Sequence, residues 1–170
     1  MRLSTDLDAI DLEILRTLQT QGRIHLGTLA ELVGLSSPAV AERVRKLEER
    51  GVISGFGAQL DPRHLGLDIA AFIMVRVDSS TNYPGFLALA IEHEEVMECH
   101  AITGEGSHIL KIRTRNTATL EALLGEIQRW PGVIGTRTNL VLSTHKETLA
   151  LPFRHAETVV AETRPARAAR

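Results

Sequence analysis

Cationic and small polar side chains gather in one stretch of the amino-terminal third of the chain. Residues 36–50 read SSPAVAERVRKLEER, in which Val40, Val44 and Leu47 recur at the spacing of one buried helical stripe. The other side of such a helix turns its charges to solvent. A helix that reads DNA presents its first turns to base edges in the major groove and places later cations against phosphates. The side chains predicted to contact DNA are Ser36, Ser37, Pro38, Ala39, Glu42, Arg43, Arg45 and Lys46.

A preceding helix and a glycine turn are needed to hold such a helix in place. Residues 25–33 predict a helix with an apolar face, and Gly34 can end it in the left-handed conformation without steric cost. Ser36 is a good N-cap for the helix that follows. This order indicates a helix-turn-helix and favours sequence-directed DNA binding. The alternative is a helical hairpin with a solvated charged face, stabilised by Glu42 and Lys46 at i, i+4.

The flanking segments complete a DNA-binding domain over residues 1–60. Residues 8–19 predict a first helix, because apolar residues recur at helical spacing behind an acidic first turn. Residues 52–60, VISGFGAQL, predict a short extended wing punctuated by glycines. Residues 61–68, DPRHLGLD, predict a linker or hinge.

The pattern of the chain changes after the linker. Four segments favour strands, and two longer segments between them have helical spacing. The order βαββαβ predicts a ferredoxin-like domain over residues 69–153, with an antiparallel sheet and both helices on one face. The other face must be solvated or covered by a partner. The fold class is therefore α+β. The predicted strands are 69–77, 96–103, 107–114 and 133–143, and the predicted helices are 83–93 and 118–130.

The last segment, residues 154–170, is low in large apolar groups and ends in Arg, Ala and Pro. Such a composition predicts a flexible tail, because little apolar surface is available to offset the entropy of ordering it. A weak cationic arm is the alternative, in which Arg164, Arg167 and Arg170 would touch phosphate.

Length and composition bound the function. The chain has 170 residues and a net charge of −2. A DNA-binding protein with this balance must concentrate its cations locally and rely on several copies for affinity. Cys99 is the single cysteine, the start MRLSTDLDAI lacks the apolar core of a signal peptide, and no apolar run could span a bilayer. We therefore expect the protein to be cytoplasmic. We expect it to bind double-stranded DNA and not to associate with a membrane.

Motifs elsewhere extend this interpretation. The chain contains, in this order, LDAIDLEILRTLQTQGRI (7–24), ERVRKLEERGVISG (42–55), ECHAITGEG (98–106) and PGVIGTRTNLVLSTHKET (131–148). Together they resemble the Lrp/AsnC, or feast/famine, transcription regulators of bacteria and archaea, over nearly the whole chain. The resemblance implies a homodimer whose sheets pack face to face, and assembly of dimers into higher oligomers. It also implies a small-molecule effector, an amino acid or related metabolite, bound between subunits.

The resemblance implies an effector site at the loop between the second and third strands and on the fourth strand. Ser107 stands where the family usually has Asp, and a neutral serine cannot hold an ammonium group. We therefore expect weak binding of ordinary amino acids, or a ligand without an ammonium group. Protonation of His108 would strengthen binding of an anion as the pH falls toward about 6. The alternative is a glycine-rich turn with no ligand. The predicted effector residues are Gly104, Glu105, Gly106, Ser107, His108, Thr136 and Thr138.

Two other functions are weighed against regulation. Some relatives of this family decarboxylate a modified tetrapyrrole, which His100, His108, Arg113 and Arg115 could serve. The cationic helix argues against such an enzyme, and also against a sensor that has lost DNA binding. A metal site at the two histidines would need a third ligand. No catalytic motif is present. The sequence therefore predicts a regulator without catalytic activity, cofactor or metal.

Overall fold

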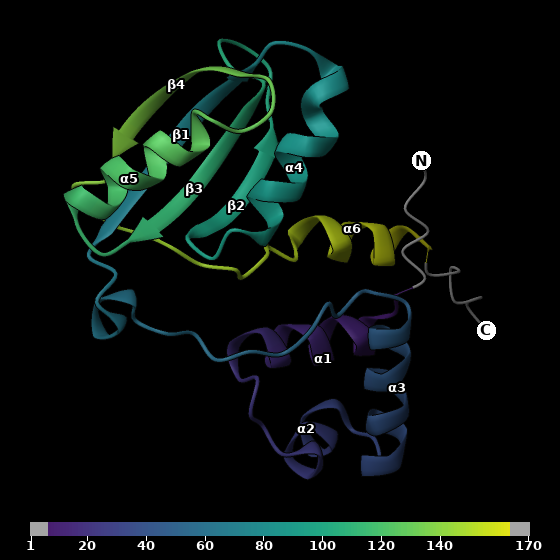
Figure 1. Ribbon diagram of the computed structural model, residues 1–170. Helices are drawn as coiled ribbons and strands as arrows, with labels where there is room; N and C mark the ends of the chain where they lie inside the picture. The colour runs from purple at the N-terminus through teal and green to yellow at the C-terminus, as the bar shows by residue number, and fades with distance from the viewer. Residues whose placement is uncertain (1–6, 164–170) are drawn as a thin grey trace. The chain divides into compact units, whose positions relative to one another are not determined.

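The computed structural model describes residues 7–163. The chain forms two compact units (Figure 1). One unit spans Met1–Ala58 together with Thr148–Arg170, and the other spans Gln59–Glu147. The division differs from the domain limits predicted from the sequence chiefly near the carboxyl end, where the chain after residue 147 folds with the amino-terminal helices. Residues 1–6 of the predicted first domain and 164–170 of the predicted tail lie outside the described residues.

The amino-terminal unit is built on three helices: α1 (Ala9–Thr20), α2 (Leu26–Val33) and α3 (Ser37–Glu49). Their core is formed by side chains that are fully or almost fully buried and come from all three helices, namely Ile14, Leu29, Ala30, Val40 and Leu47. The predicted apolar stripe of α3 is therefore the face that packs inward, and this leaves the charged face to solvent.

The turn between α2 and α3 has the predicted form. Gly34 ends α2 in the left-handed conformation, with φ of 68°. The Ser36 hydroxyl then accepts a hydrogen bond from the Ala39 amide at 3.4 Å and caps α3, with Pro38 in its first turn. These local signals set the point at which each helix ends and begins.

The predicted wing is wrong as a strand. Residues 52–60 form no regular element, and the side chains of Phe56 and Leu60 are exposed. An extended segment needs a neighbouring strand to satisfy its backbone, and no strand of the described chain pairs with this one. The predicted linker contains a single 3-10 turn, η1 (Pro62–Leu65), which is closed by Gly66.

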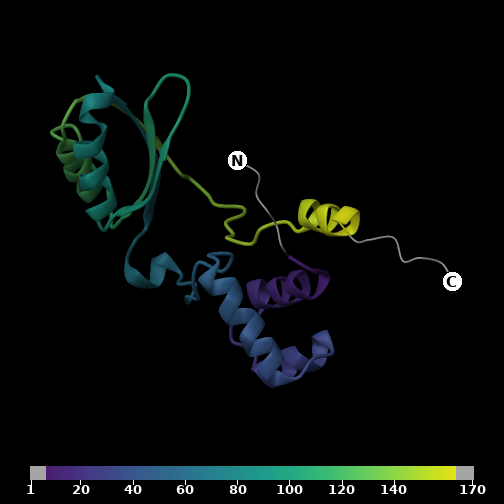
Figure 2. The same ribbon diagram turned by 90° about the vertical axis from the view of Figure 1, so that its right-hand side faces the viewer.

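The second unit is a four-stranded sheet with two helices. Its strands are β1 (Ile69–Val77), β2 (Val96–Ala101), β3 (His108–Thr114) and β4 (Val133–Leu140). They lie in the order β2-β3-β1-β4, and every neighbouring pair is antiparallel. The turn η2 (Ser80–Asn82) leads into the first of the two helices, α4 (Tyr83–Glu92) and α5 (Thr117–Ile127). Both helices lie on one side of the sheet (Figure 2). The predicted ferredoxin-like arrangement is confirmed.

The two faces of this sheet differ in burial. Ala71, Ile73, Val75 and Val77 of β1 point to the helices and are buried with side chains of α4 and α5. The alternate residues Phe72, Met74 and Arg76 point to the opposite side, because successive side chains of a strand alternate between faces. We call this second side the open face.

The predicted tail contains a helix, α6 (Arg154–Thr163), so a flexible tail is wrong for these residues. The segment leading into α6 is bound to α1. The Gln19 side chain donates to the Leu151 carbonyl at 2.9 Å and accepts from the Leu151 amide at 2.8 Å. Arg16 pairs with Glu157, and its guanidinium lies 5.4 Å from the centre of the Phe153 ring. Contacts with α1, rather than the composition of the segment, account for its order.

Candidate nucleic-acid interface and ligand site

The outward face of α3 carries most of the side chains predicted to contact DNA. The structure places these side chains together at the start of the helix and along its solvent side. The exposed residues of this set are Ser36, Ser37, Pro38, Ala39, Glu42, Arg45 and Lys46.

Arg43 lies apart from that face. Its guanidinium donates to Asp11 at 2.7 Å and to Asp8 at 2.8 Å, which ties α3 to the start of α1. Partial burial raises the pKa of Asp8, but hydrogen bonds from the Asp11 amide and from Arg43 outweigh it and hold the pKa below its usual value. Arg43 is thus already engaged by two carboxylates, and the prediction that it contacts DNA does not fit its position.

The cations on the outward face have anionic neighbours on the same helix. Arg45 binds Glu42 at 2.7 Å and also pairs with Glu49, while Lys46 lies 3.5 Å from Glu42. The hydrogen bond from Arg45 lowers the pKa of Glu42 to about 2, so Glu42 is ionised at neutral pH. DNA phosphates would therefore compete with these carboxylates for Arg45 and Lys46.

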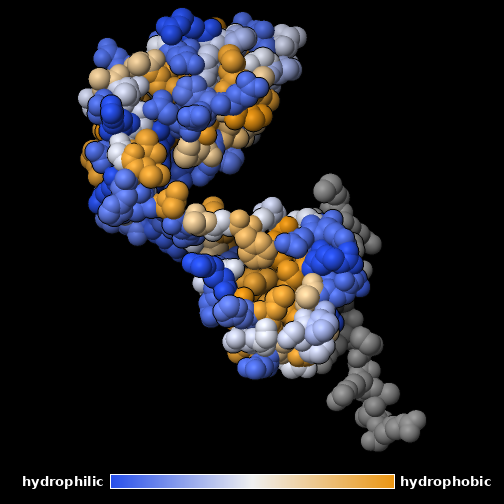
Figure 3. Space-filling model, turned by 60° about the horizontal axis from the view of Figure 1, so that its bottom comes forward, coloured by the Kyte–Doolittle hydropathy of each residue, from blue (hydrophilic) through white to orange (hydrophobic). Residues whose placement is uncertain are grey.

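The three-helix unit is not coated with charge. Figure 3 shows hydrophobic side chains gathered between charged groups on one side of this unit. Its exposed apolar residues include Leu26 and Leu32 of α2 and Phe56 beyond α3. Any contact with phosphate must then come from a local set of cations rather than from a basic surface.

Ser107 is held by the backbone of β1. The Ser107 amide donates to the Val75 carbonyl at 2.9 Å, and the Val77 amide donates to the Ser107 hydroxyl at 3.1 Å. The hydroxyl therefore closes the β2–β3 loop against the sheet. The structure gives Ser107 a structural role in place of the ligand contact predicted for it.

His108 is a core residue, with 1% of its surface exposed. Its ring packs 4.8 Å from that of Tyr83 and 4.7 Å from that of Phe86, centre to centre. Burial lowers the pKa of His108 below its usual value, because the charged form loses hydration. The prediction that protonated His108 strengthens anion binding near pH 6 is therefore wrong on both position and charge.

A hollow of about 430 Å³ lies where the β2–β3 loop meets β1 and β4. Glu105 of the loop accepts a hydrogen bond from Arg137 of β4 at 2.8 Å. Both side chains are more than half exposed. The lining residues are Met74, Val75, Arg76, Glu105, Gly106, Gly135, Thr136 and Arg137.

The hollow includes three of the seven predicted effector residues, Glu105, Gly106 and Thr136, but not Gly104, Ser107, His108 or Thr138. The register explains part of this result. Thr136 pairs with Val75 and Thr138 with Ile73, so both threonines turn toward the helices. The Thr136 hydroxyl accepts from Gln128 at 3.1 Å.

Sequence reasoning missed the two arginines of the hollow. Arg137 pairs with Met74, and Arg76 pairs with Gly135, so both arginines lie on the open face. The residues directly before and after each arginine on its strand face the helices, so the arginine itself faces the other way. Strand alternation could have found them, but only once the neighbouring strands and their register were known.

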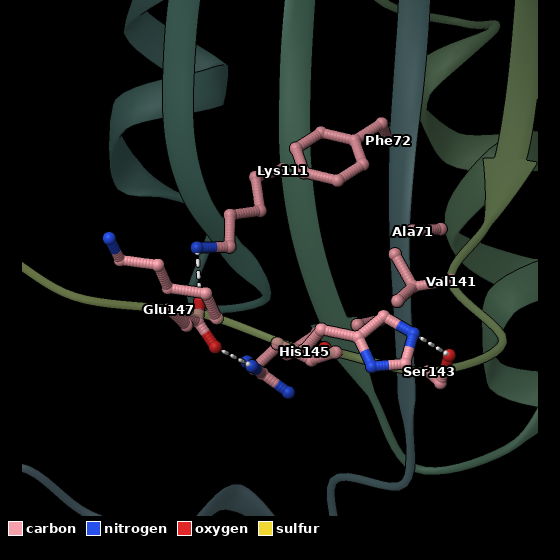
Figure 4. A pocket seen from close by; sticks show the side chains of 11 residues that line it. Ala71, Phe72, Lys111, Val141, Ser143, His145 and Glu147 are labelled. Carbon is pink, nitrogen blue, oxygen red and sulfur yellow. Dashed lines mark hydrogen bonds and ion pairs between the residues drawn. The ribbon is translucent and has the colours of Figure 1, made fainter.

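A second hollow, of about 350 Å³, lies toward the other end of the sheet (Figure 4). Lys111 binds Glu98 at 2.9 Å and also pairs with Glu147, which accepts from Arg113 at 2.6 Å. The hydrogen bond from Lys111 is the largest cause of the lowered pKa of Glu147. Lys111 and Arg113 are therefore already engaged by carboxylates.

The two histidines considered for a metal site, His100 and His108, do not converge. His100 pairs with Ile109 on the open face, whereas His108 points into the core. Within residues 7–163, no three His, Cys, Asp or Glu side chains are arranged to hold a metal ion. No helix in the described part of the chain is long and apolar enough to cross a membrane.

Both units match known domain families. Residues 7–48 match the AsnC-type helix-turn-helix domain, and residues 70–151 match the Lrp/AsnC ligand binding domain. The HTH-type transcriptional regulator FL11 of Pyrococcus abyssi is 40% identical over 91% of this chain and 100% of its own length. The leucine-responsive regulatory protein of Escherichia coli K12 is 37% identical over 86% of this chain and 92% of its own.

Solved structures agree in fold. A transcriptional regulator of Neisseria meningitidis, solved as a complex with L-Met, superposes with a TM-score of 0.82 at 31% identity. It covers 88% of this chain and 99% of its own. A feast or famine regulatory protein of M. tuberculosis, complexed with L-methionine, gives 0.80 at 34% identity and covers 85% and 98%.

Proposed function

The chain belongs to the Lrp/AsnC family of helix-turn-helix transcription regulators, and we propose that it reads double-stranded DNA with the outward face of α3. The proposal rests on the different surroundings of the residues along α3. Val40 and Leu47 anchor the helix, Arg43 ties it to α1, and small side chains at its start stand exposed. Small side chains at the start of a helix allow its backbone to approach base edges closely, and Arg45 and Lys46 follow later on the helix, where cations meet phosphates.

The second part of the proposal concerns an effector. Two relatives were solved with L-methionine, and the hollow at the β2–β3 loop offers the charges that an amino acid needs. Arg137 would receive a carboxylate and Glu105 an ammonium group. Glu105 thus replaces the anion that Ser107 lacks, which removes the ground for expecting a ligand without an ammonium group.

The third part concerns assembly. The open face carries Phe72, Met74 and Ile109, on the side of the sheet opposite to α4 and α5. We expect the open faces of two copies to pack together in a two-fold homodimer, and dimers to form a higher oligomer. Several copies of α3 would then act on one DNA molecule, which suits a protein with a net charge of −2. We place this regulator in the cytoplasm, where DNA is accessible.

The relatives are named as regulators and not as enzymes. The tetrapyrrole alternative would need His108 and Arg113 to face a ligand. His108 is buried in the core, and Arg113 is paired with Glu147. Regulation is therefore the function that the residues support best.

Selection of bound fragments from genomic DNA tests the proposal. The full chain should enrich a near-palindromic site whose half-sites are separated by about one helical turn or a multiple of it. The same site should be lost when Ser37 and Ala39 are both replaced by Glu, because two carboxylates would then face the bases. Enrichment of no sequence, or an unchanged site in this variant, would overturn the role given to α3.

A further inference from the structure

We propose that the hollow at the β2–β3 loop selects an acidic amino acid, aspartate or glutamate, over a neutral one. This inference rests on the proposed effector role of the same hollow. It comes from the charge that remains there after the ion pairs are formed.

Three charged side chains line the hollow. Glu105 and Arg137 are paired at 2.8 Å and balance each other. Within residues 7–163, Arg76 makes no ion pair and no hydrogen bond through its guanidinium. The hollow therefore has one uncompensated positive charge, and Arg76 carries it.

Glycines at two places give the hollow its shape. Arg76 faces Gly135 across the β1–β4 pair, and a Cβ atom at position 135 would lie 3.5 Å from Arg76 Nη2. A longer side chain there would fill the space beside the guanidinium. A Cβ atom at Gly106 would lie 3.1 Å from the Val75 carbonyl, so glycine allows the loop to approach β1 closely. The loop thereby brings Glu105 beside the part of β1 and β4 that carries the two arginines.

The two arginines are diagonal neighbours on the open face. Arg137 pairs with Met74 and Arg76 with Gly135, so each lies two positions from the partner of the other. Diagonal positions are about 7–8 Å apart at the backbone, which long side chains bridge easily. One small ligand can therefore touch both guanidinium groups.

An acidic amino acid matches these groups one to one. Its ammonium group would replace Arg137 as the partner of Glu105, and its α-carboxylate would replace Glu105 as the partner of Arg137. Because both side chains are more than half exposed, they can separate to admit the ligand. The second carboxylate would then pair with Arg76. A neutral amino acid leaves Arg76 without a partner, and a dicarboxylate without an ammonium group sets a negative charge against Glu105.

Calorimetric titration of the full chain with isosteric pairs tests this selection. Glutamate and glutamine differ in one charge at nearly constant shape, as do aspartate and asparagine. We expect at least one acid to bind about tenfold or more tightly than its amide, since a charge-assisted hydrogen bond distinguishes them. Arg76→Gln should remove this preference by weakening the acid and sparing the amide. Arg115→Gln, which removes a cation at the opposite end of β3, should keep it.

The outcomes separate the two claims. If a neutral amino acid binds as tightly as the acids, or if Arg76→Gln retains the preference, the selection for acids is wrong while the effector role stands. If no amino acid binds to the wild type at millimolar concentration, both the selection and the effector role fail.

Discussion

Arg43 Nη1 lies 2.7 Å from Asp11 Oδ1, which joins the middle of α3 to the first turn of α1. Asp11 is the more enclosed partner, with 10% of its side chain exposed. The contact ties α3 to α1. A cation on the helix proposed to bind DNA can thus serve the fold rather than the DNA.

Replacement of Arg43 should therefore destabilise the helical unit. Arg43→Gln leaves the Asp11 carboxylate enclosed without its charged partner, and we expect a loss of about 1–3 kcal/mol. Urea unfolding followed by circular dichroism would report the helices, while fluorescence of Trp130, the single tryptophan, would report the sheet unit. Arg45→Gln is the matched control and should not shift the helical transition. Equal effects of the two substitutions would contradict the structural role of Arg43.

The pH dependence of the sheet unit should follow His108. The pKa of His108 is lowered by burial, so the unfolded chain takes up the proton first. The stability that the buried, neutral His108 contributes is fully present above the usual pKa of 6.5. It is lost as the pH falls from 6.5 through the lower pKa of the folded state. Unfolding followed by Trp130 fluorescence between pH 7.5 and 5.5 should show the loss. The same slope should persist in His100→Gln, and an NMR titration that gave His108 a pKa above 6.5 would refute the account.

Much of the fold could be predicted from local patterns. The bounds of β1 match because a continuous apolar run ends there in alternating residues, and α3 begins where Ser36 and Pro38 signal a start. Such signals act within a few residues and need no knowledge of the tertiary structure.

The errors concern contacts between distant parts of the chain. Arg43 and Asp11 are 32 residues apart, and Gln19 and Leu151 are 132 apart. Nothing local marks either pair, so the sequence alone favours a DNA contact for Arg43 and a flexible tail for residues 154–170, which follow Leu151 closely. The resemblance implies a ligand contact for both threonines of β4, but the register turns them toward the helices, and only Thr136 lines the hollow. Tertiary pairing decides these positions, and local sequence does not encode it.

The carboxylates on α3 should weaken DNA binding. Glu49 pairs with Arg45 and must release it before a phosphate can bind. Glu49→Gln should therefore strengthen binding to DNA of any sequence, by a few-fold at low salt. Glu48→Gln changes the net charge equally without removing a partner of Arg45, and should give a smaller gain in fluorescence anisotropy titrations. A larger gain for Glu48→Gln would show that bulk charge, and not the Arg45 pair, limits binding.

The order of the chain before α6 should depend on Gln19. Because the Gln19 side chain satisfies both backbone groups of Leu151, Gln19→Ala should speed amide hydrogen exchange across residues 151–157. Gln21→Ala removes a similar exposed side chain close by and should leave exchange there unchanged. Mass spectrometry of peptic peptides would measure both variants. Unaltered protection in Gln19→Ala would mean that the Arg16–Glu157 and Arg16–Phe153 contacts suffice to hold the segment.

The salt dependence of DNA binding tests the central claim most directly. If α3 meets DNA, a variant with Arg45→Gln and Lys46→Gln should bind all sequences more weakly. Its slope of log affinity against log salt should fall by about one unit for each phosphate that the variant no longer binds. A control with Arg115→Gln and Arg129→Gln removes two exposed cations from the sheet unit and should keep the wild-type slope. If the α3 variant instead binds like the wild type at every salt concentration, α3 is not the helix that meets DNA.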